Sequence, residues 1–312
     1  MTYTKYIVLA ALSLGAACTS TPQSQPERVN LIANVSEYDP KKDVKDKESP
    51  INTNGEFSDF DAKYIKSQGV DALIARATTV SGDNLYKNYK GLKILDNDRR
   101  FSDFMKAADQ AGLRLGAYHL LRPNEDPVKQ ADYYLETIKD CYENRKLKNA
   151  KFLMVLDAGF SSVPGKVAKR DGIDPKTIRQ RVTEKEVITF IKRIYEKTGK
   201  YPFYYPEGGA SYGEIASWSQ PSKKLLLKCP LWIPRFTEID PFKGRSVTPW
   251  KNWTMHQYAS ALSRMDNKYY YYYHDSLTVI KRNNNIIPLE LSRWNKSIPS
   301  ELWDDHSYDA SK

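Results

Sequence analysis

Short apolar runs alternate with amphipathic segments along most of the chain from residue 30 onward. A short apolar run bounded by turn residues is typical of a buried strand, whereas apolar residues spaced three or four apart indicate a helix. Runs of the first kind occupy residues 31–36, 72–78, 115–121, 152–157, 202–205, 231–236, 253–258 and 269–274. Helical spacing occurs at residues 60–69, 101–112, 128–142 and 184–199 and fades after the fifth strand. This order predicts an α/β fold, a single TIM-like (β/α) barrel of about eight strands whose last strands lack full helices.

The fourth predicted strand ends in a carboxylate. Residues 152–157 are apolar up to Asp157, and turn chemistry follows at Gly159. Active sites of such barrels lie at the C-terminal ends of the strands, so Asp157 is the first candidate catalytic residue. Glu207 follows the fifth strand at the same end and is a second candidate, although we favour a solvated loop residue at this position.

The charge of the chain narrows the choice of partner. The 312 residues carry a formal net charge of +10, which favours an anionic partner such as nucleic acid, an anionic membrane or an acidic cell-wall polymer. The sequence contains neither a zinc-finger pattern nor an arginine-rich arm, so we do not expect nucleic acid. With four histidines and no metal-ligand spacing, we expect no metal and no cofactor.

The N-terminal segment has the features of an export signal. Lys5 precedes an apolar stretch over residues 6–17 that is too short to span a bilayer in the usual way, and small residues lead to Cys18. We therefore assign residues 1–18 as a lipoprotein-type signal peptide with lipid attached to Cys18, residues 19–29 as a polar tether and residues 30–312 as the barrel domain. Cleavage after Ala16 or Ala17 with a soluble exported product is the alternative. Cys141 and Cys229 could then pair or stay free.

Several segments carry a family likeness. They are residues 74–78, 98–101, 112–119, 130–134, 156–157, 200–205, 230–233, 250–253 and 256–258. In this order they resemble glycoside hydrolase family 25, the Chalaropsis-type lysozymes. The resemblance implies a barrel of about eight strands and hydrolysis of the bond between N-acetylmuramic acid and N-acetylglucosamine in peptidoglycan. Peptidoglycan is therefore the expected partner, reached by an exported, membrane-anchored and monomeric protein.

The chain departs from the pattern of that family at acidic positions. Asn34 stands in place of the first acid of an Asp-x-Ser motif, and Gly159 stands where the fourth strand would present the Glu to which the resemblance gives the acid role. Ser260 replaces an Asp that commonly follows the Gln-Tyr pair of the seventh strand, and Asp275 is a loose match for an Asp of the eighth. Glycine cannot donate a proton, and the loss of a general acid typically costs about 10²–10⁴-fold in rate.

The candidate substrate-binding residues lie at or near strand ends. They are Asn34, Ser36, Arg76, Tyr118, His119, Tyr205, Trp232, Arg235, Gln257 and Tyr258. Each has a structural alternative, because barrel interiors hold large side chains and buried ion pairs. The run from Tyr269 to Tyr273 could likewise serve binding or packing. The alternation of a strand would turn one set of rings toward the groove and the other toward a neighbouring element.

Three functions stay open at this point. The chain could bind glycan without cutting it, cut it with an acid from another part of the chain, or use the barrel for a different ligand. Cleavage requires a second carboxylate across the groove from Asp157. Binding alone requires an aromatic groove but no second acid.

Overall fold

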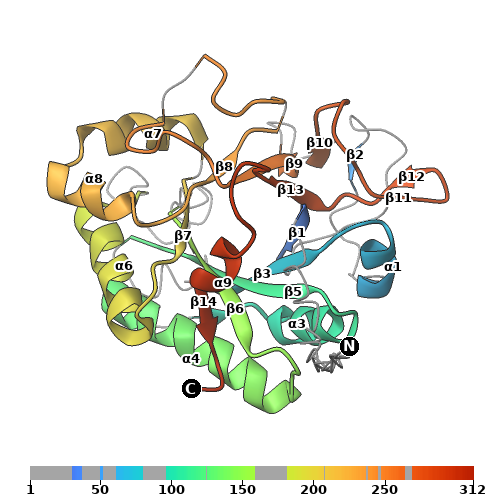
Figure 1. Ribbon diagram of the computed structural model, residues 1–312, viewed down its shortest axis with the longest axis horizontal. Coiled ribbons are helices and arrows are strands. Elements are labelled where there is room, and N and C mark those ends of the chain that lie inside the picture. The colour runs from blue at the N-terminus through green and yellow to red at the C-terminus, as the bar shows by residue number, and fades with distance from the viewer. Residues whose placement is uncertain are drawn as a thin grey trace, which may run out of the picture.

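The protein folds into a barrel with helices on its outside (Figure 1). The computed structural model describes residues 30–36, 50–51, 61–79, 96–123, 125–158, 181–206, 208–236, 238–244, 247–263 and 269–312. The barrel strands are β1 (Leu31–Val35), β3 (Ala72–Thr79), β5 (Arg114–Leu120), β6 (Lys151–Asp157), β7 (Phe203–Tyr205), β8 (Trp232–Pro234), β9 (Met255–Ser263) and β13 (Glu290–Trp294). The predicted α/β barrel of about eight strands is confirmed.

Seven of these strands are parallel and the eighth is antiparallel. The strands β1, β3, β5, β6 and β7 pair in parallel in that order, and β8 pairs in parallel with β9. A bridge between Tyr204 and Leu231 joins β7 to β8. The strand β13 pairs antiparallel with β9 on one side and β1 on the other, which nearly closes the ring.

The eighth barrel strand is therefore not the one that the sequence pattern indicated. Residues 269–274 do form a strand, β10 (Tyr269–Tyr272), but it pairs antiparallel with the far end of β9 and with the short β2 (Pro50–Ile51). The position between β9 and β1 belongs instead to β13, in a C-terminal region where the sequence pattern indicated no strand. The prediction was wrong because the long β9 extends beyond the barrel and pairs with β10 there.

Helices cover the outside of the parallel strands. The four predicted helices are confirmed as α1 (Ala62–Ser67), α3 (Phe101–Gln110), α4 (Pro127–Arg145) and α6 (Glu184–Thr198). A capping box between Thr183 and Glu186 starts α6, and Gly199 ends it in the left-handed conformation. The helices do not fade after β7 as expected, because α7 (Gly208–Ser217) and α8 (Gln220–Leu226) separate β7 from β8.

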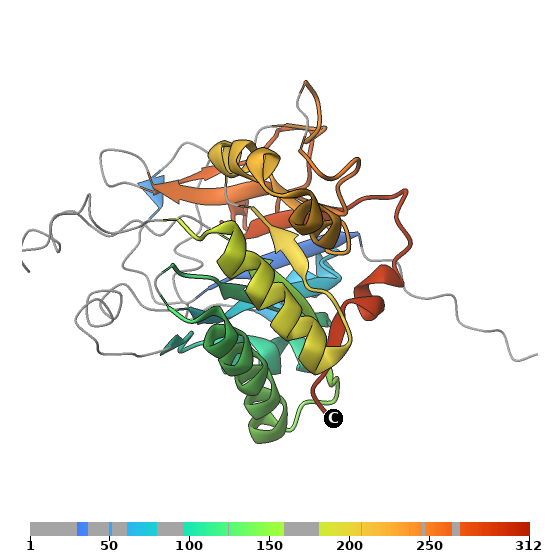
Figure 2. The same cartoon turned by 90° about the vertical axis from the view of Figure 1, so that its left-hand side faces the viewer.

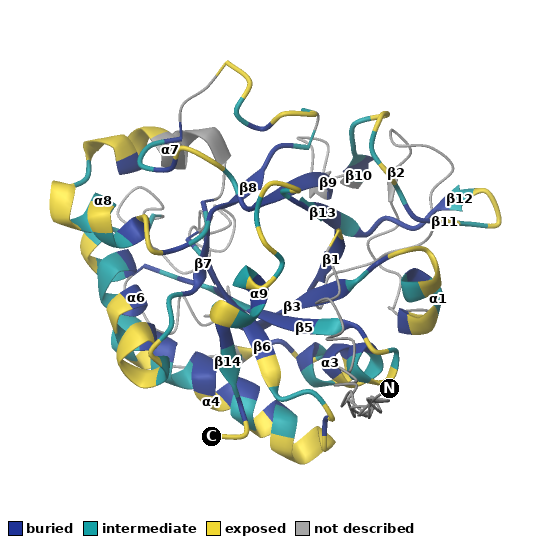
Figure 3. Cartoon of the chain, in the orientation of Figure 1, coloured by how far each residue is buried: buried dark blue, intermediate teal, exposed yellow. Residues whose placement is uncertain are grey.

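The core has two layers, one inside the barrel and one between the barrel and the helices. Inside lie side chains such as Ile32, Leu153, Phe203 and Trp294, whereas the outer layer joins alternate strand residues to buried faces of the helices. Figure 3 shows this arrangement as dark blue strands surrounded by helices that are yellow on their outer faces. This division follows from the two-residue period of a strand.

The C-terminal segment covers the N-terminal end of the barrel. The short helix α9 (Leu302–Asp305) places the fully buried Trp303 among the inner side chains, and β14 (Ser307–Asp309) pairs antiparallel with β6. In Figure 2 this red segment lies on the right, so the opposite end, where the parallel strands finish, is the open end of the barrel. The remaining short strands are β4 (Asp96–Asn97), β11 (Lys281–Arg282) and β12 (Asn285–Ile286).

The two cysteines of the barrel are not paired. Cys141 and Cys229 are both buried and free, so the alternative of two buried thiols is the correct one. Burial raises the pKa of the Cys141 thiol to about 11, which keeps it protonated at neutral pH. Within the described residues, no helix is long and apolar enough to cross a membrane. Residues 1–29, with Cys18, lie outside the described residues, and their assignment stays a prediction.

Gly116 on β5 is needed for the inner packing of the barrel. A Cβ atom at this position would lie 2.7 Å from Cγ1 of Ile74 on the neighbouring strand. We predict that Gly116→Ala lowers the free energy of unfolding by about 1–3 kcal/mol, because the added methyl overpacks the interior. Urea denaturation measures this change. Gly213→Ala is the control, since Gly213 is exposed with open space around it. Equal midpoints for the two variants would contradict the prediction.

Candidate active site

A pocket opens among the ends of the barrel strands, and Asp157 lies in its wall. The pocket holds about 270 Å³ and is lined by Asn34, Tyr118, Val155, Asp157, Tyr205, Trp232 and Glu290. These residues come from β1, β5, β6, β7, β8 and β13, so almost the whole ring of strands contributes.

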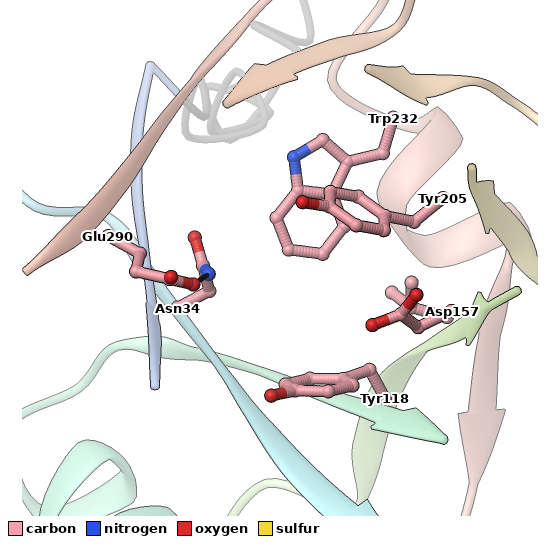
Figure 4. A pocket seen from close by; sticks show the side chains of 7 residues that line it. Asn34, Tyr118, Asp157, Tyr205, Trp232 and Glu290 are labelled. Atoms are coloured by element: carbon pink, nitrogen blue, oxygen red, sulfur yellow. Dashed lines mark hydrogen bonds between the residues drawn. The ribbon is translucent and has the colours of Figure 1, made fainter. Parts of the chain in front are cut away.

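Two carboxylates face the pocket from opposite sides. Figure 4 shows Asp157 on one side and Glu290 beside Asn34 on the other, with aromatic rings between them. Asp157 is the last residue of β6, and Glu290 is the first residue of β13. Because β13 is antiparallel to its neighbours, its first residue lies at the edge where the parallel strands end. The site therefore contains the second carboxylate that cleavage would require.

Glu290 is held by two hydrogen-bond donors. Its Oε1 accepts a hydrogen bond of 2.7 Å from Oγ of Ser260, and its Oε2 accepts one from Nδ2 of Asn34. Asn34 is the register partner of Glu290 across the β1–β13 pair, so the two side chains leave the sheet on the same face. Two donors directed at one carboxylate are complementary to its ionised form. The amide oxygen Oδ1 of Asn34 is buried without a hydrogen-bond partner in the described structure.

Aromatic rings form the remaining walls. The Tyr205 and Trp232 rings meet edge to face with centroids 4.9 Å apart, and Tyr118 lies on the other side of the carboxylates (Figure 4). The Tyr205 hydroxyl donates to Oε1 of Gln257 at 2.5 Å, and the indole N–H of Trp232 donates to Oγ of Ser292 at 3.0 Å. These hydrogen bonds fix both rings. Gln257 itself is buried, and it contributes by holding Tyr205 rather than by lining the pocket.

His119 and Tyr258 do not line the pocket, contrary to their assignment from the sequence. Each follows an inward-facing residue, Tyr118 or Gln257, so the strand period turns both outward. His119 is fully buried between Thr78, 2.7 Å from its Nδ1, and Gln130, 2.9 Å from its Nε2. The hydroxyl of Tyr258 donates to the Thr278 carbonyl at 2.6 Å. Both are structural side chains.

The two candidate arginines are also outside the lining. Arg76 forms a buried ion pair with Asp98, whose Oδ2 lies 3.1 Å from its Nη2. This ion pair is the structural role that the sequence analysis left open for Arg76, because the guanidinium is bound to a carboxylate of the protein itself. Arg235 follows β8 and is nearly buried, and its backbone N–H donates to Gln257 at 2.8 Å. Its Nε and Nη2 have no hydrogen-bond partner among the described residues.

The remaining candidates lie elsewhere or are not described. Ser36 is buried directly after β1 and is not part of the lining. Asp275 lies on an exposed turn after β10. Gly159 and Glu207 lie outside the described residues. In the part of the chain that the structure describes, no group of three or more His, Cys, Asp or Glu side chains could hold a metal ion.

Glu290 is the functional candidate that the sequence analysis missed. The sequence does contain the two-residue alternation of a strand in this region. One face would carry Leu289 and Leu291, and the other would carry Glu290, Ser292 and Trp294. The apolar runs identified from the sequence ended at residue 274, so this region was not assigned a strand. In the barrel, Glu290 occupies the eighth strand, where the family likeness led us to expect a carboxylate and to match it loosely to Asp275.

Comparison with known proteins assigns the family. The model of the glycosyl hydrolases family 25 matches residues 51–266, which is more than half of the chain. The chain belongs to glycosyl hydrolases family 25. An autolytic lysozyme from Clostridium acetobutylicum is 35% identical over 80 residues, which span 26% of this chain and 20% of that lysozyme. The likeness to this relative is therefore local.

Solved structures share the fold of this family 25 member. A bacterial lysozyme from Streptomyces coelicolor superposes with a TM-score of 0.54 at 16% identity, over 90% of this chain and 99% of the other. A muramidase from Acremonium alcalophilum gives 0.51 at 15% identity, over 88% and 99%. The spore cortex lytic enzyme SleM of Clostridium perfringens gives 0.51 at 20% identity, over 86% and 68%. At these identities the likeness supports the fold alone.

The environment of His119 predicts a pH dependence of stability. Burial lowers the pKa of His119 to about 4, below its ordinary value of 6.5. The unfolded chain then binds the proton more readily than the folded chain, so the contribution is complete above pH 6.5 and is lost as the pH falls toward 4. We predict that this residue alone removes about 2 kcal/mol of unfolding free energy between pH 7 and pH 5.

Urea denaturation at pH 7 and pH 5 measures this dependence. His119→Gln should show a smaller loss between the two pH values than the wild type, whatever its stability at pH 7. His274→Gln is the matched control, because His274 is only partly buried after β10, and it should retain the wild-type loss. An unchanged loss in His119→Gln would contradict the prediction.

Proposed function

We propose that this protein hydrolyses glycosidic bonds in the glycan of peptidoglycan, at the link between N-acetylmuramic acid and N-acetylglucosamine, with Asp157 and Glu290 as its two carboxyl groups. The observation that carries the proposal is the presence of Glu290 across the pocket from Asp157 (Figure 4). Membership of family 25 supports the substrate class. The net charge of +10 favours approach to an anionic wall polymer.

The surroundings of Glu290 support a role for this carboxyl group in its ionised form. Glu290 accepts hydrogen bonds from Ser260 and Asn34, which suit a carboxylate that stays ionised. We assign to Glu290 the stabilisation of positive charge on the sugar ring as the glycosidic bond breaks. To Asp157, the other carboxyl group of the pocket, we assign donation of a proton to the leaving glycosidic oxygen. Water then adds to the anomeric carbon and gives a proton to Asp157, which restores the site.

The other lining residues suit sugar recognition. The faces and edges of Tyr118, Tyr205 and Trp232 offer apolar surface to pyranose rings, while the polar atoms of Tyr205 and Trp232 remain hydrogen-bonded. The buried Oδ1 of Asn34 is an acceptor without a partner, which costs free energy unless a ligand supplies a donor. An acetamido N–H or a sugar hydroxyl would supply it. These features support an amino sugar as the occupant of the pocket.

Binding without cleavage is the second candidate function. It is favoured by Gly159, which stands where the family resemblance expects the proton donor. A protein of this kind would keep the aromatic pocket and hold glycan strands without releasing fragments. Asp157 and Glu290 would then serve as hydrogen-bond acceptors for sugar hydroxyls.

Release of muropeptides from purified peptidoglycan tests cleavage. We predict that Asp157→Asn and Glu290→Gln each reduce the rate of release by about 10²–10⁴-fold, because each removes a carboxyl group that the reaction uses. Asp275→Asn is the matched control, since this carboxylate lies on an exposed turn outside the lining, and it should keep wild-type activity. Absence of release by the wild type, with co-sedimentation on the same sacculi, would exclude cleavage and support binding alone.

We further propose that the protein is exported and anchored through lipid on Cys18. The apolar residues 6–17 ahead of this cysteine and the polar residues 19–29 behind it support an anchor followed by a tether. Such a tether would hold the barrel near the membrane while the open end of the barrel reaches the cell wall. The monomeric state stays a prediction.

Membrane fractionation tests the anchor. We predict that the wild-type protein sediments with membranes and resists extraction by salt, because acyl chains insert into the bilayer. Cys18→Ser should move it to the soluble exported fraction. Cys141→Ser is the control, because this buried thiol belongs to the barrel. A wild-type protein found entirely in the soluble fraction would refute the anchor.

A further inference from the structure

The ribbon formed by the ends of β9, β10 and β2 projects at the open end of the barrel. Tyr269 to Tyr272 of β10 pair antiparallel with Ser260 to Ser263 of β9, and Tyr269 and Tyr270 pair with β2. In Figure 2 these orange strands reach the blue β2 at the left of the view, on the side opposite the red C-terminal segment. The ribbon therefore lies beside the pocket rather than over the closed end of the barrel.

The register of the ribbon determines which tyrosines face the pocket side. Ser260 is directly opposite Tyr272 in the β9–β10 pair, and residues opposite each other project from the same face. The Ser260 side chain reaches Glu290 in the pocket, with Oγ 2.7 Å from Oε1. Tyr272 therefore projects on the face that carries the pocket. Tyr270, two residues away on the same strand, projects on the same face.

The alternate tyrosines pack on the other face of the ribbon. Tyr271 is fully buried in the outer core, where its hydroxyl donates to the Leu289 carbonyl at 2.5 Å and its ring lies 5.7 Å from that of Tyr273. Tyr270 and Tyr272 are in contrast half-buried. The tyrosine run is therefore divided between two faces, with Tyr271 buried in the core and Tyr273 packed against it, and with Tyr270 and Tyr272 half-buried on the face that carries the pocket.

We propose that Tyr270 and Tyr272 form a second sugar-binding site that extends the pocket along the ribbon. The ligand is a further part of the same glycan chain, two or more amino-sugar units away from the cleaved bond. We infer this ligand because the tyrosine face is continuous with the pocket: Ser260 lies opposite Tyr272 and its hydroxyl contacts Glu290. A polymer bound in the pocket must leave it over a neighbouring surface. Tyrosine rings offer flat apolar faces to pyranose rings and hydroxyls to their polar edges.

The proposal rests on the proposed function, since it assumes that glycan occupies the pocket. It adds a preference for long chains. We expect a tetrasaccharide, with two sugars on each side of the cleaved bond, to gain little from the ribbon, whereas a chain three times as long would also contact Tyr270 and Tyr272. The two tyrosines should therefore affect the binding of long glycan strands more than that of short ones.

Calorimetric titration with glycan strands of two lengths tests this preference. The titrations use the full protein carrying Asp157→Asn, so that the ligand is not consumed, with a peptidoglycan tetrasaccharide and a strand three times as long. Adding Tyr270→Ala and Tyr272→Ala together should weaken binding of the long strand about tenfold, as expected for the loss of two ring contacts. Binding of the tetrasaccharide should change less than twofold.

Two further variants separate stacking from a folding defect. Tyr272→Phe keeps the ring and should retain long-strand binding, while thermal melting reports whether the double variant is folded. Tyr195→Ala is the matched control, because this exposed tyrosine lies near the C-terminal end of α6, away from the pocket. It should leave the affinity for both ligands unchanged.

The outcomes distinguish the second site from the proposed function. If the Asp157→Asn protein binds both strands and the double alanine variant binds the long one equally well, the second site is refuted and the proposed function stands. If the Asp157→Asn protein and the wild type bind neither strand, the proposed function fails and the second site fails with it. A folded double variant that loses only long-strand affinity supports the second site and the binding of glycan in the pocket, while the release assay decides whether the glycan is cleaved.

Discussion

The pairing of β13 between β1 and β9 is the constraint on which the site depends. One antiparallel strand completes a ring that is otherwise parallel, and it satisfies backbone groups on both neighbouring edges. The reversal of direction also brings the start of β13, rather than its end, to the edge where the other strands finish. The same strand pairing therefore closes the barrel and places Glu290 in the pocket.

The fold was largely predictable because its signal is local. Buried parallel strands produce continuous apolar runs, and covering helices produce a regular apolar spacing, so β3, β5, β6 and α6 could be identified from neighbouring residues alone. The eighth strand could not be identified in this way, because its identity depends on which of two strands pairs with β1. That choice joins residues at opposite ends of the chain, and the tyrosine-rich β10 had the stronger local pattern.

The candidate site was predictable on one side only. Asp157 lies in the lining because the end of a parallel strand reaches the open end of the barrel, and Tyr118, Tyr205 and Trp232 follow the same rule. His119 and Tyr258 lie outside the lining because the alternation of a strand turns adjacent residues to opposite faces, whereas motif likeness treats a whole tripeptide as one unit. The ion pair of Arg76 could not be predicted, because its partner Asp98 lies on a separate turn.

The antiparallel β13 also affects when the site can exist during the life of the protein. Glu290 lies close to the C-terminus, so the first two-thirds of the chain contains Asp157 and most of the aromatic wall but neither the closing strand nor the second carboxylate. A chain emerging in sequence order therefore carries an open sheet and half a site until its last strands are released.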